Sequence, residues 1–323
     1  MGGMKNNTSR RDFLRGGLAL GGIVAVSRLP AFADDPAVFP GRGRFERLVL
    51  AYQHIDVGAV KPFSILHISD THLTDAYPDE GEMKQKLKAA RTRCFGGRQE
   101  EALRDSLAWA KENVDYVLHT GDLIDWQSRA NFDLVKKYYG PGMFGSVGNH
   151  EYSRNMWLEK SENTEAYKDG TRAEVAAAYP FDVKLASTVV NGVNFVTLDD
   201  VYGYVTAEQA ERFRAEAKKG LPIILCMHVP FYTPGIWRAN HKFWRAGAKF
   251  TTAAIPDARG DYMRQQTDPV TREFIAYLKG EPLLKGILAG HLHIAVQERF
   301  SPTAMQYVVG GNFMFHGQEV TFA

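Results

Sequence analysis

The fold of this 323-residue chain is decided by the stretch 63-FSILHISDTHL-73. Its first part, from Phe63 to Ser69, is apolar enough to predict a buried strand. Asp70 and His72 follow where the strand ends and a turn begins. Because these two residues are two positions apart just past a strand, both side chains can point into one space. The stretch therefore predicts a strand whose carboxyl end carries a carboxylate and an imidazole.

Further clusters repeat this arrangement of an apolar run followed by polar residues. They are Gly121-Asp122, Gly148-Asn149-His150, the isolated His228, and Gly290-His291-Leu292-His293. The apolar runs before them end at Leu118, Val147, Met227 and Ala289. Open α/β sheets bind ligands at the carboxyl ends of their strands. We therefore expect all of the clusters to lie together.

The clusters offer carboxylate or amide oxygens and imidazoles, with no thiolate. The candidate metal ligands are Asp70, His72, Asp122, Asn149, His228, His291 and His293. Oxygen and imidazole ligands suit zinc, iron or manganese. The set is large enough for two ions, and two cations about 3.5–4 Å apart need a bridging carboxylate. The sequence thus predicts a dinuclear metal site that could activate water and bind phosphate oxygens.

Strand-like and helical runs alternate without an internal repeat or a low-complexity linker, which favours one domain of mixed α/β class. An amphipathic pattern predicts a helix over Gln99–Asn113, and Thr206 and Asp268 are expected to cap two further helices. Asn191-Gly192 predicts a β-hairpin, and Met305–Phe322 is expected to form antiparallel strands. Other strands are expected at Asp115–His119, Ile223–Met227 and Gly286–Ala289. The natural arrangement is two packed mixed β-sheets flanked by helices.

In their order and spacing, the clusters resemble the signature of the calcineurin-like metallophosphoesterases. The matching pieces are Asp70-x-His72, Gly121-Asp122-x-x-Asp125, Gly148-Asn149-His150-Glu151, His228 and Gly290-His291-x-His293. The resemblance runs from about residue 60 to residue 295, and five pieces in sequence are far more specific than one. It implies the four-layer α/β/β/α fold of that family.

The resemblance also implies a role for each residue. One ion would be held by Asp70, His72 and His293, and the other by Asn149, His228 and His291. Asp122 would bridge the two ions, which requires it to lie within a few ångströms of both His228 and His293. His150 resembles the family histidine that binds the phosphate and helps to protonate the leaving group. Its alternative is a structural role in a turn.

Two departures from relatives bear on the site. Purple acid phosphatases, a branch of the same superfamily, have tyrosine at the position of Asp125 and glycine at that of His72, so a tyrosinate–iron centre is not expected. Glu151 stands where many relatives have aspartate, and it either orients His150 or caps the turn. Asp125 is expected to support a ligand or cap a helix rather than to bind metal.

The implied activity is hydrolysis of a phosphodiester or phosphomonoester of a small molecule, by attack of a hydroxide that bridges the metals. The diester is favoured because the first motif is close to that of cyclic-nucleotide and related phosphodiesterases. One alternative is a non-enzymatic metal-binding or scaffold protein of the same fold, although such proteins lose ligands that this chain retains. Another is a periplasmic nuclease.

The N-terminus resembles a twin-arginine (Tat) signal peptide. Ser9–Arg15 carries the arginine pair, with Arg15 where lysine is usual, and Gly16–Val26 is too short and glycine-rich to span a bilayer. Ala31-Phe32-Ala33 precedes an expected cleavage before Asp34. We therefore expect a signal peptide over residues 1–33 and a metallophosphoesterase domain over 34–323. The Tat export machinery would deliver this domain to the periplasm or the medium, with no membrane anchor after cleavage.

The net charge bears on nucleic-acid binding, and the cysteine content bears on disulfide bonds. Residues 1–33 carry a net charge of +4 and the whole chain +2, so the remainder is slightly acidic and stable nucleic-acid binding is not expected. Cys94 and Cys226 are expected to remain unpaired thiols.

Two segments outside the clusters bear on specificity. Phe231–Phe250 contains Tyr232, Trp237, Arg238, His241, Trp244 and Arg245. It could bind a base and a phosphate, or be an ordinary lid that packs on the domain. The basic run Lys84–Arg93 is expected to be a solvated helix face.

Overall fold

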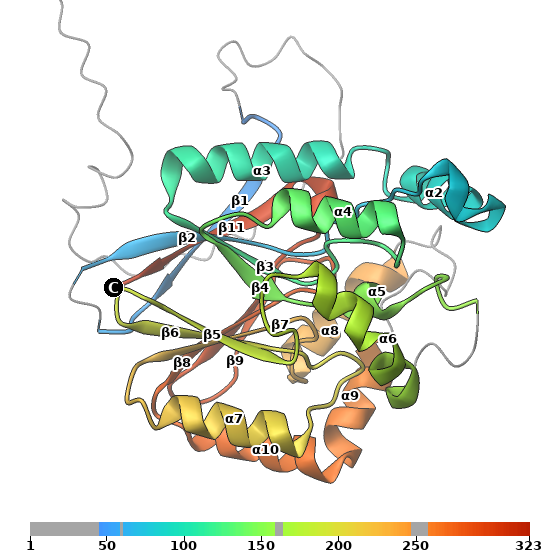
Figure 1. Ribbon diagram of the computed structural model, residues 1–323. Coiled ribbons are helices and arrows are strands. Elements are labelled where there is room, and N and C mark those ends of the chain that lie inside the picture. The colour runs from blue at the N-terminus through green and yellow to red at the C-terminus, as the bar shows by residue number, and fades with distance from the viewer. Residues whose placement is uncertain (1–44, 59–60, 159–163, 247–257) are drawn as a thin grey trace, which may run out of the picture.

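Two β-sheets pack face to face, and helices cover the outer face of each, giving four layers (Figure 1). The computed structural model describes residues 45–58, 61–158, 164–246 and 258–323. The expected α/β fold of two mixed sheets flanked by helices is confirmed. The expected signal peptide, residues 1–33, lies outside the described residues.

The first sheet has the strand order β1-β11-β2-β3-β4. Its strands are β1 (Val49–Ile55), β2 (Phe63–Ile68), β3 (Tyr116–Thr120), β4 (Met143–Ser146) and β11 (His316–Phe322). β2, β3 and β4 are parallel, whereas β11 is antiparallel to β2 and parallel to β1. The carboxyl ends of β2, β3 and β4 therefore meet at one edge of the sheet.

The second sheet has the order β5-β6-β7-β8-β10-β9. Its strands are β5 (Leu185–Val190), β6 (Val193–Leu198), β7 (Ile223–Met227), β8 (Leu284–Ala289), β9 (Val296–Arg299) and β10 (Met305–Val308). β6, β7, β8 and β10 are parallel. The predicted hairpin joins β5 to β6, with positive φ at Asn191 and Gly192.

Helices fill the outer layers and the edge where the parallel strands end. They are α2 (Glu82–Cys94), α3 (Gln99–Asn113), α4 (Arg129–Tyr138), α5 (Asn149–Tyr152), α6 (Glu165–Ala178), α7 (Ala207–Ala217), α8 (Pro234–Ala246), α9 (Ala258–Thr267) and α10 (Pro269–Gly280). α3 has the predicted bounds, and the caps at Thr206 and Asp268 are confirmed. Within the described ranges, no helix has the length and apolar character needed to cross a membrane.

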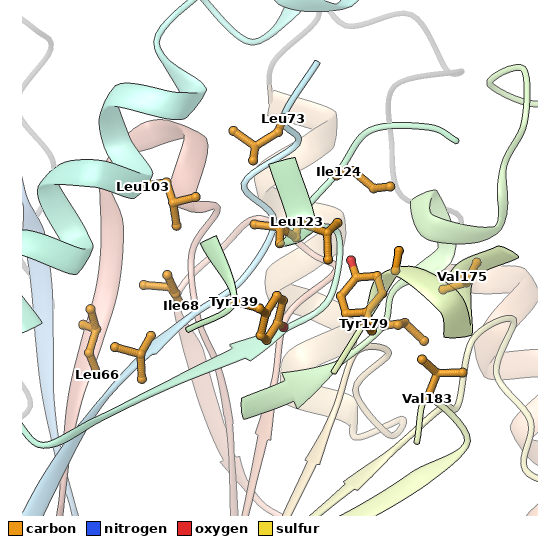
Figure 2. Close-up of a cluster of buried hydrophobic side chains, with 14 of the residues drawn as sticks. Leu66, Ile68, Leu73, Leu103, Leu123, Ile124, Tyr139, Val175, Tyr179 and Val183 are labelled. Atoms are coloured by element: carbon orange, nitrogen blue, oxygen red, sulfur yellow. The ribbon is translucent and has the colours of Figure 1, made fainter. Parts of the chain in front are cut away.

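Apolar side chains hold the layers together. Phe63 and Ile65 of the first sheet pack with Phe195 and Ile224 of the second. On the outer side of the first sheet, Figure 2 shows Leu66, Ile68 and Leu103 of the cluster that joins β2 to α3. Cys94 and Cys226 are free thiols, as expected.

The expectation for the C-terminal segment was wrong in one respect. β10 and β11 do not pair with each other but belong to different sheets. Each has one antiparallel neighbour, β9 for β10 and β2 for β11. Gly310 and Gly311 lie between these strands, where the chain crosses from one sheet to the other.

Candidate metal centre

Each expected ligand lies just past the carboxyl end of a strand. The strands and their residues are β2 with Asp70 and His72, β3 with Asp122, β4 with Asn149, β7 with His228, and β8 with His291 and His293. The turns are joined by backbone hydrogen bonds, from Asp70 N to the oxygen of Gly121 at 3.0 Å and from Gly290 N to that of His228 at 3.1 Å. The site therefore spans the aligned edges of both sheets.

Residues of the site have an unusual backbone conformation. The angle φ is positive at Asp70 (56°), His72 (54°), Asp122 (54°), His291 (68°) and His293 (56°). A side chain at positive φ clashes with its own backbone, and such strain costs about 1–3 kcal/mol per residue. Strain that persists at several adjacent turns indicates a functional site, and the local sequence does not predict it.

Gly121 shows why the turns approach so closely. Its φ is 95°, and a Cβ there would lie 2.6 Å from the backbone nitrogen of Gly148 and 2.7 Å from Nδ1 of His228. Only glycine leaves room for these contacts. The glycine before Asp122 thus allows the turns after β3, β4 and β7 to meet.

A first group of side chains gathers around Asp70. Nε2 of His293 lies 3.2 Å from Oδ1 of Asp70 and 3.1 Å from Nε2 of His72. Oδ2 of Asp122 lies 3.8 Å from Nε2 of His72. One atom from each of these four residues lies within 4.8 Å of the others, as a single cation would require.

A second group gathers around His228. Its Nε2 lies 3.1 Å from Oδ1 of Asn149, 3.2 Å from Oδ2 of Asp122 and 3.2 Å from Nδ1 of His291. Asp122 belongs to both groups, so it lies close to both His228 and His293. The structure thus brings all seven expected ligands together, in the two sets that the resemblance implies.

The donor atoms fit cations better than they fit one another. Oδ1 of Asp70 is buried and accepts no hydrogen bond within the described part of the chain. The facing nitrogens of His72 and His293, and of His228 and His291, need a proton or a cation between them. Ligand atoms ~2.1 Å from a tetrahedral cation lie ~3.4 Å apart, close to these separations.

The electrostatics of the centre favour positive charge. Burial opposes ionisation of Asp70 and Asp122, yet neighbouring histidines, including His228, hold the pKa of both carboxyls well below its usual range. Burial alone would lower the pKa of His228, but the charges of Asp122 and Asp70 raise it to about 10. Two buried carboxylates therefore stabilise a cation at this position.

His150 borders the centre without joining either group. Its Nδ1 lies 2.8 Å from the backbone carbonyl oxygen of Asp125 and 2.9 Å from Oδ1 of the same residue. Its Nε2 lies 3.9 Å from Oδ2 of Asp122. Burial opposes its charge, but Asp122 and Asp125 raise the pKa of its imidazole. The ring is 11% exposed, whereas the side chain of His228 is fully buried. His150 is thus placed to meet a ligand that approaches from outside.

Asp125 orients two histidines and is held by an arginine. Its Oδ1 lies 3.0 Å from Nδ1 of His72, a candidate ligand, which is the contact that a supporting role would require. Arg91 of α2 donates to both oxygens, from Nε at 2.6 Å and Nη2 at 3.0 Å. Although His72, Asp125 and His150 could together hold an ion, the guanidinium already neutralises that carboxylate.

The basic run Lys84–Arg93 is therefore more than a solvated helix face. Besides Arg91, Lys88 pairs with Asp75 at 2.6 Å, and Lys84 donates to the carbonyl oxygen of Gln127 at 2.7 Å. These contacts attach α2 to the turns of the centre. The sequence pattern could not reveal them because the partners lie in distant segments.

Two buried carboxyl groups support the turns from behind. Glu151 caps the turn of Asp122 through backbone N–H groups, which selects one of its two expected roles. Oδ1 of Asp200 accepts the backbone N–H groups of His228 at 3.2 Å and Val229 at 3.1 Å. Burial raises the pKa of Asp200 to about 7. Asp200 matches no motif, so the sequence did not single it out.

Aromatic rings also border the candidate ligands and His150. Phe95 stacks on His72 with centroids 4.4 Å apart, Trp157 meets His150 edge-on at 4.6 Å, and Phe313 lies 5.2 Å from His293. All three rings are half-buried. They provide apolar surface next to the candidate ligands.

The segment Phe231–Phe250 contributes less to the site than its aromatic content suggested. Trp244 is buried, donates to the carbonyl oxygen of Leu292 at 3.1 Å and lies 5.8 Å from His293. Trp237 instead packs against His241, with ring centroids 4.0 Å apart and the ring planes tilted by 55°. Residues 247–250 and the side chain of Arg245 lie outside the described residues.

Comparison with known proteins shows that a family model matches most of this chain. Residues 63–295 match the family model described as calcineurin-like phosphoesterase. No match to a curated protein was found.

Several solved structures are similar to this chain. A dimetal phosphatase from Danio rerio is 16% identical with a TM-score of 0.45, over 78% of this chain and 88% of that one. A 5′-nucleotidase from Candida albicans is 13% identical with a TM-score of 0.38, over 81% of this chain and 47% of that one. A calcineurin-like phosphoesterase from Bacillus subtilis is 11% identical with a TM-score of 0.38, over 78% and 82%. Likeness at this level supports no statement about substrate.

Proposed function

Because the chain belongs to the calcineurin-like phosphoesterase family, we propose that it hydrolyses a small-molecule phosphodiester at a dinuclear metal centre. The observation that carries this proposal is the position of Asp122, which lies within ligand distance of both donor groups. A carboxylate shared by two groups is what a pair of adjacent cations requires.

The proposed ligands divide between two ions. Asp70, His72 and His293 would hold one ion, Asn149, His228 and His291 the other, and Asp122 both. When bound, the two ions lower the pKa of a water molecule and polarise the phosphate oxygens. Imidazole and oxygen donors suit manganese, iron or zinc.

His150 would act on a substrate that reaches the centre. Its Nδ1 is held by Asp125, so its Nε2 is free to face the phosphate group. The carboxylates of Asp122 and Asp125 raise the pKa of the ring, which favours the protonated form. We therefore assign His150 to hydrogen-bond a phosphate oxygen and to protonate the leaving group.

The aromatic border supports a diester rather than a monoester as substrate. Phe95, Trp157 and Phe313 present half-buried rings around the candidate ligands. A diester carries two organic groups, and on this proposal one of them would lie against the border while the other leaves. Apolar surface of this kind would stabilise such a group.

The test is hydrolysis of bis(p-nitrophenyl) phosphate and of p-nitrophenyl phosphate by protein loaded with manganese, iron or zinc. We expect faster turnover of the diester, and loss of both activities in Asp122→Ala. Preference for the monoester would overturn the choice of substrate. No hydrolysis of either ester by protein with two bound metals would overturn the enzymatic proposal in favour of a scaffold role, and cleavage of single-stranded DNA would favour a nuclease.

We further propose that residues 1–33 are a twin-arginine signal and that residues 34–323 act in the periplasm or the medium. The support is the sequence Ser9–Arg15 with the apolar segment and Ala31-Phe32-Ala33 after it. Replacement of Arg10 and Arg11 by lysine should retain the full-length protein in the cytoplasm. Unchanged export of that variant would contradict the proposal.

A further inference from the structure

Asp261 of α9 contacts a candidate metal ligand although it belongs to none of the sequence motifs. Its Oδ2 lies 3.0 Å from Nε2 of His291. The carboxylate is 13% exposed and the imidazole 6%. A polar contact this well buried is a fixed part of the site rather than a surface encounter.

The contact determines which nitrogen of His291 carries the proton. Nδ1 of His291 points at the second donor group, 3.2 Å from Nε2 of His228. A neutral imidazole has one N–H and one lone pair. With a carboxylate at Nε2, the proton resides there, and the lone pair of Nδ1 is left for a cation.

The same rule holds at two other candidate ligands. Nδ1 of His72 faces Oδ1 of Asp125 at 3.0 Å, and Nδ1 of His228 faces the carbonyl oxygen of Thr120 at 2.7 Å. In both rings, Nε2 points into the centre. His291 is the reverse case, because its Nε2 points away and meets Asp261.

Helix α9 is seated firmly enough to aim this carboxylate. Tyr262 is buried in a cluster with Leu292, next to His291. Gln265 accepts the backbone N–H of Tyr232 at 2.8 Å and donates to the carbonyl oxygen of Pro230 at 3.1 Å. Leu292, Pro230 and Tyr232 lie close in sequence to the candidate ligands His291 and His228, and they also hold the helix in place.

A glycine in a neighbouring loop allows α9 to lie in this position. Gly203, in the loop after β6, has φ of 72°, and a Cβ there would lie 2.3 Å from the carbonyl oxygen of Asp261. The backbone of α9 thus lies directly against the loop that follows Asp200. Contacts on two sides fix the position of Asp261.

We propose that Asp261 is a positioning residue that fixes the tautomer and orientation of His291 and so sets the metal affinity of one site only. This inference rests on the dinuclear centre proposed above. The affected site is that of Asn149, His228 and His291. The site of Asp70, His72 and His293 depends instead on Asp125. Loss of a carboxylate that supports a ligand histidine typically weakens metal binding ~10–100-fold.

The first test is calorimetric titration of metal-free protein with MnCl2. In Asp261→Asn, one of the two binding steps should weaken ~10–100-fold while the other stays unchanged. Asp125→Asn should weaken the opposite step. Gln266→Ala, an exposed position on the same helix, should change neither. Equal weakening of both steps in Asp261→Asn, or no change in either, would overturn the proposal.

The second test reads the tautomer directly in metal-free protein. Long-range 1H–15N spectra of the imidazoles, with His291 assigned through His291→Gln, should show the Nε2–H form in the wild type. Asp261→Ala, which removes the acceptor, should shift His291 towards the Nδ1–H form. A wild-type Nδ1–H tautomer would overturn the proposal. Because this measurement needs neither metal nor substrate, it is independent of whether the proposed hydrolysis occurs.

Discussion

Nδ1 of His67 accepts a hydrogen bond from the side-chain amide of Gln318 at 2.6 Å, inside the first sheet. Its other nitrogen, Nε2, lies 2.8 Å from the hydroxyl of Thr120, at the end of the strand that leads to Asp122. Burial, together with His119, lowers the pKa of His67 to about 3. The ring is therefore neutral in the folded protein across the physiological range.

The first prediction is that His67 makes the unfolding free energy decrease as the pH is lowered. Below pH 6.5 the unfolded chain binds a proton at this position that the folded protein does not bind until about pH 3. The contribution of His67 to the unfolding free energy is therefore fully present above pH 6.5 and is lost as the pH falls from 6.5 to about 3. In metal-free protein, the unfolding free energy of the wild type should fall more steeply than that of His67→Gln, by up to ~1.4 kcal/mol per pH unit. Parallel urea-denaturation profiles from pH 6.5 to 4 would contradict this.

The second prediction concerns the carboxylate that caps the turn of Asp122. Glu151 accepts backbone N–H groups from Asp122 at 3.0 Å, Leu123 at 2.8 Å and Gly148 at 2.7 Å. In Glu151→Gln an NH2 group replaces one carboxylate oxygen. That group cannot accept a hydrogen bond, so buried backbone N–H donors lose their partner. We expect a loss of ~3 kcal/mol or more in unfolding free energy. Glu82→Gln, whose side chain is 81% exposed, should change it by less than ~0.5 kcal/mol. Equal effects of the two substitutions would show that the cap is not needed.

The third prediction separates protonation from metal binding. Because His150 lies outside both donor groups, His150→Ala should retain its metal content. Its kcat should fall ~10²–10⁴-fold, as expected when a general acid is removed. His54→Ala, at an exposed position on β1, serves as control and should match the wild type. Loss of metal from His150→Ala would make His150 a ligand instead, and an unchanged kcat would remove it from the reaction.

The fourth prediction tests the aromatic border. Phe313→Ala removes a half-buried ring that lies 5.2 Å from His293. KM for bis(p-nitrophenyl) phosphate should rise roughly 3–10-fold, with a smaller rise for the monoester. Tyr52→Ala, an exposed aromatic residue of β1, should leave KM unchanged. Equal changes for both esters would show that the ring does not contact the second organic group.

The parts of the fold that could be predicted are those with a strong local pattern. The amphipathic helix Gln99–Asn113, the hairpin at Asn191-Gly192 and the caps at Thr206 and Asp268 each depend on neighbouring residues. The pairing of β10 and β11 depends instead on distant strands, so the local pattern could not assign them to different sheets.

The same division holds for the site. The seven expected ligands could be located because each follows an apolar run and matches a family motif. Arg91 and Asp261 could not be, because nothing near them in the sequence indicates which residue each contacts. Positive φ at Asp70 and His72 also results from contacts between turns rather than from local sequence.

The most direct test of the central claim is anomalous diffraction from crystals of the protein soaked in MnCl2. The account predicts two peaks, ~3.5–4 Å apart, with the carboxylate of Asp122 between them. One peak would lie by Asp70 and His293, and the other by His228 and His291. A single peak, or two peaks that do not share Asp122, would contradict it.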